Sequence, residues 1–206
     1  MALVKSKSGP AAASMEPVGG DVASLLLSLS SDDARARRNA ARELADHPQA
    51  AMALCDRLEH ERGPSVRAVL FTSLIRLQSP DVAGRLAMHL RSDDAQLRNG
   101  AIEALQEMPD AIAPHLSDLL NDDDSDVRIF AVNILGALRF EEAPRLLTEV
   151  LRKESHINVC AAAVDALAEV GGMEAIEALE ELRARFADDA FIVFAVDTAI
   201  RRIRAD

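Results

Sequence analysis

The five histidines are the side chains best suited to general base catalysis or metal binding in this chain. They are His47, His60, His89, His115 and His156. They fall at different points of the repeating pattern described below and form no column, so we expect surface or helix-end positions for them. One of them precedes a glutamate, at His60-Glu61. A single His-Glu pair has no partner to complete a coordination shell, so we predict no metal site.

Other residue types that carry chemistry also lack the necessary spacing. The run from Asp122 to Asp126 resembles a calcium-binding loop, but it lacks the required glycine and the glutamate at the twelfth position. Helix capping explains it better. Cys55 and Cys160 are far apart and belong to no CxxC pair, so we expect two buried thiols in a reducing compartment. No nucleophile elbow, P-loop or dinucleotide fingerprint is present. The sequence therefore predicts no catalytic residue and no cofactor.

The composition favours closely packed helices. Hydrophobic residues make up 49% of the 206 positions, aromatic residues only 3%, and Trp and Tyr are absent. A core rich in Ala and Leu suits α-helices, whereas β-sheets favour branched and aromatic residues. We therefore expect an all-α protein.

An internal repeat begins after position 20, with a period in the range typical of solenoid proteins. The segment Ser31–Ala34 recurs as Ser92–Ala95, two periods later. The arginines that follow the repeated turns recur at a nearly constant interval, at Arg37, Arg67, Arg98 and Arg128. Apolar residues follow each arginine at helical spacing. In a fifth and a sixth copy the arginine position is read as Cys160 and Ile192, so we expect those repeats to pack on apolar contacts instead.

Each period contains two predicted helices. The first has a Leu-rich face, for example Leu86 and Leu90, and the second follows an Asp- and Ser-rich turn that caps it. Pro114 and Pro144 are one period apart, and we expect both in the opening turn of a first helix.

From position 21 to about 204 this pattern resembles the bacterial short-period HEAT repeats, the group that includes phycobilin-lyase-like proteins. Asp126-Val127-Arg128, followed by Ala131 and Leu135, is the copy most similar to the motif. The resemblance implies a right-handed α-solenoid of about six helix pairs. It also implies that Arg37, Arg67, Arg98 and Arg128 pair with acids of the turns and form a structural ladder.

Two enzymatic groups have similar repeats. Deoxyhypusine hydroxylases place His-Glu pairs just after the Val-Arg motif to bind two irons, but this chain has Ala68-Val69, Asn99-Gly100 and Ile129-Phe130 there. Phycobilin lyases act on a bilin, and a chain without Tyr or Trp has few side chains to stack on a tetrapyrrole.

The charge is unevenly distributed. The formal net charge is -11, and residues 81–206 hold 25 acidic and 13 basic residues. Such a surface repels phosphate backbones, so we expect no nucleic-acid partner. No segment is apolar enough to span a membrane and no secretory signal is present, so we expect a cytoplasmic protein. Residues 1–20 are rich in Ala, Ser, Gly and Pro, which predicts a disordered tail before a solenoid over 21–206.

The candidate binding surface is the concave face, which second helices line in such solenoids. Three positions per second helix are expected to form one stripe there. The stripe residues that we select as candidate partner contacts are Arg76, Glu103, Glu107, Phe130, Asn133, Asp165, Glu169, Phe194 and Asp197. Acidic residues around an exposed Phe suit a partner segment with a basic residue and an apolar anchor, although Phe130 and Phe194 could equally pack against neighbouring helices.

These observations favour a non-catalytic protein-interaction module, an adaptor or scaffold. The alternative is a lyase-like or chaperone-like accessory factor that helps a cofactor-containing protein to mature. A third hypothesis is a structural subunit that docks through an apolar outer face of its last helix, at Phe191, Ile192 and Val193. The sequence leaves the oligomeric state open.

Overall fold

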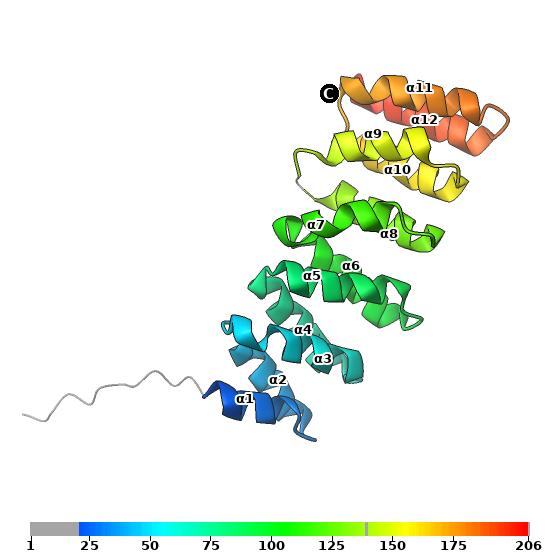
Figure 1. The fold of residues 1–206 in the computed structure, drawn as a ribbon. Helices are drawn as coiled ribbons and strands as arrows, with labels where there is room; N and C mark the ends of the chain where they lie inside the picture. The colour runs from blue at the N-terminus through cyan, green and yellow to red at the C-terminus, as the bar shows by residue number, and fades with distance from the viewer. Residues whose placement is uncertain (1–20, 139, 206) are drawn as a thin grey trace, which may run out of the picture.

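The computed structural model of the chain describes residues 21–138 and 140–205. Within these ranges the chain forms twelve α-helices and three 3-10 helices, with no strand (Figure 1). The predicted tail, residues 1–20, lies outside the described residues.

The helices form six pairs that stack one on the next along the chain (Figure 1). The first helices of the pairs are α1 (Val22–Leu29), α3 (Ala51–His60), α5 (Pro80–Met88), α7 (Pro109–Leu120), α9 (Ala143–Lys153) and α11 (Ile176–Arg185). The second helices are α2 (Ala34–Leu44), α4 (Pro64–Leu77), α6 (Ala95–Gln106), α8 (Ser125–Ala137), α10 (Ile157–Val170) and α12 (Ala190–Ile203). The 3-10 helices are η1 (Pro48–Ala50), η2 (His89–Arg91) and η3 (Met173–Ala175).

The core repeats with the sequence. Each second helix packs against its own first helix and against the second helix of the next pair. The leucines at the same position of five second helices are completely buried, namely Leu44, Leu74, Leu105, Leu135 and Leu167. Burying a leucine side chain contributes roughly 1.5–3 kcal/mol, so this column stabilises the stack along its whole length. The prediction of an all-α solenoid of helix pairs is confirmed.

Acidic turns start the second helices in two ways. Asp33, Asp94, Asp124 and Asp189 precede α2, α6, α8 and α12, and each side chain accepts a hydrogen bond from a free N–H of the first turn. The helices α4 and α10 have no side-chain cap, and in the turns before them a glutamate binds the backbone of the turn itself. Glu61 accepts from the N–H of Arg62 and Gly63, and Glu154 accepts from the N–H of Ser155 and His156.

The repeat register predicted for α12 was wrong by one residue. With Asp189 as the cap, Ile192 occupies the position of Val127 in α8, three residues after the cap. Ile192, which the predicted register places one position later as the counterpart of the arginine, is fully buried, whereas Phe191 is 65% exposed. The stripe positions lie six, nine and thirteen residues after the cap, as Phe130, Asn133 and Glu107 do in their helices. In α12 these positions are 195, 198 and 202, so Phe194 and Asp197 do not belong to the stripe.

Of the two first helices with a predicted opening proline, one begins earlier than the proline spacing predicted. Pro144 does lie in the opening turn of α9. Pro114, however, lies inside α7, which begins at Pro109. Pro109 provides the fixed φ and the missing N–H that favour a proline at a helix start, and Pro114 still falls within the first half of the helix.

Candidate functional site

The four repeated arginines share one contact, a hydrogen bond to the carbonyl oxygen six residues before them. The bonds run from Arg37 to Ser31 at 2.8 Å, from Arg67 to Glu61 at 2.8 Å, from Arg98 to Ser92 at 2.7 Å and from Arg128 to Asp122 at 2.7 Å. These carbonyls lie at or just beyond the end of a first helix, where the helix itself offers no donor. Each arginine therefore joins the two helices of its own pair.

Three of the four arginines also reach a carboxylate in the turn of the next repeat. Arg37 Nε lies 2.8 Å from Glu61 Oε2, and Arg67 Nη2 lies 2.6 Å from Asp94 Oδ2. Arg128 Nε lies 2.7 Å from Glu154 Oε2. These ion pairs hold consecutive repeats together.

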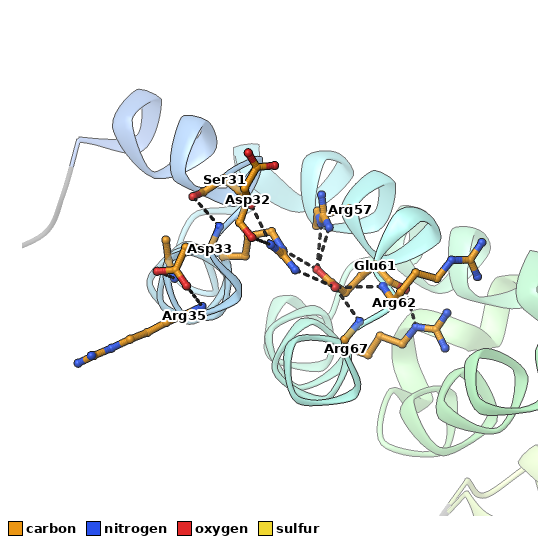
Figure 2. Close-up of polar contacts among 11 residues, drawn as sticks. Ser31, Asp32, Asp33, Arg35, Arg57, Glu61, Arg62 and Arg67 are labelled. Atoms are coloured by element: carbon orange, nitrogen blue, oxygen red, sulfur yellow. Dashed lines mark hydrogen bonds and ion pairs between the residues drawn. The ribbon is translucent and has the colours of Figure 1, made fainter.

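Glu61 is the most enclosed carboxylate of this set, with 1% of its surface exposed. It accepts hydrogen bonds from Arg37 and Arg57 and from the backbone of its own turn. Figure 2 shows the side chain of Glu61 with Arg57 directed toward it. Burial alone would raise the pKa of Glu61. The hydrogen bonds from Arg37, from the Gly63 N–H and from Arg57 outweigh it and lower the pKa to about 2. Glu61 therefore stays ionised and structural at neutral pH.

Arg98 differs from the other three arginines. It forms no ion pair with any residue of the described ranges, and the buried Nε has no hydrogen-bond acceptor there. Its guanidinium instead lies 5.7 Å from the centre of the Phe130 ring. Asp122, in the turn of the next repeat, pairs with Arg91 instead. Between the third and fourth repeats, Arg91 of η2 therefore supplies the ion pair in place of the second-helix arginine.

An arginine from another helix serves the fifth repeat. Cys160 Sγ lies 3.5 Å from the Glu154 carbonyl oxygen, the acceptor that an arginine at position 160 would use. Arg185, at the end of α11, donates to this same carbonyl and to that of Leu151, both at 2.8 Å. Our expectation of purely apolar contacts in this repeat was wrong, because a guanidinium still reaches the end of α9.

The candidate contact residues fall into three groups. Glu103, Glu107, Asn133 and Asp165 are exposed, and the three carboxylates form no ion pair within residues 21–138 and 140–205. A second group is exposed or half-exposed but paired, namely Arg76 with Asp46 at 2.5 Å, Glu169 with Arg202 at 2.5 Å and Asp197 with Arg183 at 2.8 Å. The aromatic residues differ from each other, since Phe130 is half-buried against the core and Phe194 is 66% exposed.

A groove of about 480 Å³ lies between α4 and α6 on the second-helix side. Phe71, Ile75 and Ala104 contribute apolar surface to it, and Glu103 and Glu107 line the side formed by α6. Two of the candidate contact residues thus meet at one hollow. Phe71 was not among our candidates, because it does not occupy one of the three stripe positions of α4.

The comparisons with known proteins identify the repeat. A family model described as HEAT repeats matches residues 22–106 and 113–192. The chain belongs to the HEAT-repeat family. The recognition of the family from the Val-Arg motif is confirmed. A search of the curated proteins finds no match to this chain.

The solved structures that match the chain have low sequence identity to it. Two are engineered proteins, 21% and 22% identical, with TM-scores of 0.41 and 0.43; the alignments cover 89% and 90% of this chain and 96% and 99% of theirs. A third is the complex of CpcE and CpcF of phycocyanin lyase from Nostoc sp. PCC7120, 18% identical with a TM-score of 0.39, over 97% of this chain and 100% of the other. Membership of the HEAT-repeat family therefore rests on the family model.

The HEAT-repeat stack has a second groove that the sequence did not reveal. It measures about 410 Å³ and lies on the first-helix side between α7 and α9. Leu120, Leu146 and Val150 give it an apolar floor, while Asp123 and Lys153 lie among its charged lining.

The described part of the chain contains no group of three or more His, Cys, Asp or Glu side chains arranged to hold a metal ion. None of its helices is long and apolar enough to cross a membrane. The outer face of the last pair is mixed, because Phe191 and Phe194 are exposed while Arg204 approaches Glu180 within 3.7 Å.

Proposed function

We propose that this HEAT-repeat protein is a non-catalytic adaptor or scaffold that binds a partner protein along its second helices. The observation that carries the proposal is the set of exposed carboxylates at equivalent positions of that surface. Glu103 and Asp165 each lie nine residues after the cap of their helix, as does Asn133 in α8 between them. Because α6, α8 and α10 pack side by side, these three positions face the same way.

The absence of internal partners gives this surface its binding potential. Two acids of the first helices are neutralised by arginines of neighbouring repeats, Asp56 by Arg85 and Glu181 by Arg152. Glu103, Glu107 and Asp165 have no such cation within the described ranges. An acidic surface of this kind steers a basic partner and adds specificity more than raw affinity. We therefore expect the partner to carry a basic segment and to bind more weakly as the salt concentration rises.

Site-specific photo-cross-linking in cells that make the protein tests this proposal. A photoreactive phenylalanine analogue is placed at Asn133 or Asp165 on the second helices, and at Met88 or Asp118 on the first helices, all of which are exposed. We expect the first two positions to capture the same protein and the last two to capture none. Capture from Met88 and Asp118 alone would contradict the proposal. A purified preparation that carries bound pigment or metal would favour an accessory factor instead.

A further inference from the structure

The groove between α4 and α6 combines an apolar floor with two free negative charges. Phe71 and Ile75 of α4 and Ala104 of α6 supply the apolar part. Glu103 lies on α6 and Glu107 follows one turn later as the C-cap residue of this helix, and both line the groove.

A glycine sets the position of the aromatic ring in this groove. A Cβ atom at residue 100 would lie 2.6 Å from Phe71 Cζ and closer still to Phe71 Cε2, far below van der Waals contact. Gly100 therefore allows the ring to lie directly against the backbone of α6. Phe71 remains only half-buried in this position, so part of its ring is accessible from the groove.

No cation from the described part of the chain occupies the groove. No basic residue contributes to its lining. The arginine of α4 one residue beyond the groove, Arg76, is held by Asp46 at the end of α2, at 2.5 Å. The two carboxylates thus remain available to a cation from outside, and the apolar floor offers nothing to a small hydrated ion.

We propose that this groove binds one arginine side chain of a partner protein. Its methylene stem packs on Phe71 and Ile75, and its guanidinium pairs with Glu103 and Glu107. Arginine fits better than lysine, because a planar guanidinium presents several donors in a fixed geometry and so pairs with two carboxylates at once. The proposal rests on the second-helix surface being the partner-binding surface.

Random peptides displayed on phage and selected on the immobilised full chain test the proposal without a known partner. We expect the selected peptides to share an arginine beside apolar residues. A selected peptide should bind the Glu103→Gln, Glu107→Gln double variant about tenfold more weakly or worse, since one factor of ten corresponds to about 1.4 kcal/mol. Replacing the arginine of the peptide with lysine should lower affinity less than replacing it with alanine.

The matched control is the Glu141→Gln, Glu142→Gln double variant, which removes two exposed glutamates outside the groove. It should bind the peptide like the wild type. The proposal is overturned if selection enriches no arginine-containing peptide, or if the groove variant binds as tightly as the control while both melt at the wild-type temperature. Cross-linking from Asn133 and Asp165 that persists in the groove variant would show that the second-helix surface stands even where the groove proposal fails.

Discussion

Arg37 donates two hydrogen bonds to Glu61, at 2.8 and 3.1 Å, across 24 residues of sequence and from one repeat to the next. The same pairing recurs from Arg67 to Asp94 and from Arg128 to Glu154. These contacts explain how a core of small and medium apolar side chains holds consecutive repeats at a fixed spacing.

Glu61→Gln should lower the free energy of unfolding at neutral pH and make that free energy less dependent on pH below about pH 5. Glu61 has its pKa lowered from 4.5 to about 2 in the folded chain, so its contribution is present above about pH 5 and is lost as the pH falls toward 2. The expected loss at pH 7 is about 3 kcal/mol. Urea denaturation at several pH values measures it, with Glu141→Gln as an exposed control. Equal losses at pH 7 and pH 2.5 would contradict the assignment.

Arg128→Met should cost more stability than Arg98→Met. The first change leaves Glu154, whose side chain is 9% exposed, without its cation and should cost about 3 kcal/mol. Arg98 has no carboxylate partner in the described residues, so its loss removes mainly one hydrogen bond, about 1 kcal/mol. Chemical denaturation of the two variants compares them directly. A larger loss for Arg98→Met would show that its contact with Phe130 has been underestimated.

Gly100→Ala should destabilise the protein even though alanine is the better helix former. The added Cβ would lie within 2.6 Å of the Phe71 ring, and overpacking of this kind costs roughly 1–3 kcal/mol. In a Phe71→Ala background the same change should instead stabilise by up to about 1 kcal/mol, because the obstacle is gone. A double-mutant cycle by thermal unfolding gives the coupling. Additive effects of the two changes would contradict the close contact.

The two cysteines should be unreactive in the folded chain. Burial raises the pKa of Cys55 to about 11 and also raises the pKa of Cys160 above its usual range. Both side chains are also at most 1% exposed. A thiol reagent with an absorbance readout should detect no thiol in the native protein and two per chain in denaturant. Rapid reaction of either thiol without denaturant would refute this placement.

The repeat architecture could be predicted because arginine, aspartate and leucine recur at a constant spacing, and these residues carry the caps and the core. The register of α12 could not be predicted because residues 191–194 are all apolar, so the period can be placed in two ways. Glu169 pairs with Arg202 just as Asp46 pairs with Arg76 earlier in the stack. This ion pair identifies the register of α12, but it is visible only in the structure.

The sequence also predicted only part of the candidate surface, because contacts between helices cannot be read from one helix. Side-chain spacing within a helix places Glu103, Glu107 and Asp165 outward, but it contains no information on pairing between helices. The sequence therefore could not tell that Arg76 and Glu169 are engaged by neighbouring repeats, or that Arg185 substitutes for the missing arginine at position 160.

Carboxylate footprinting of the full chain, with and without the protein captured by cross-linking, tests the central claim most directly. A carbodiimide couples a small amine to accessible carboxylates, and mass spectrometry then measures each site. We predict that binding reduces labelling of Glu103, Glu107 and Asp165 and leaves the exposed Asp118 of α7 unchanged. Protection of Asp118 with unchanged labelling of the three second-helix carboxylates would contradict the account.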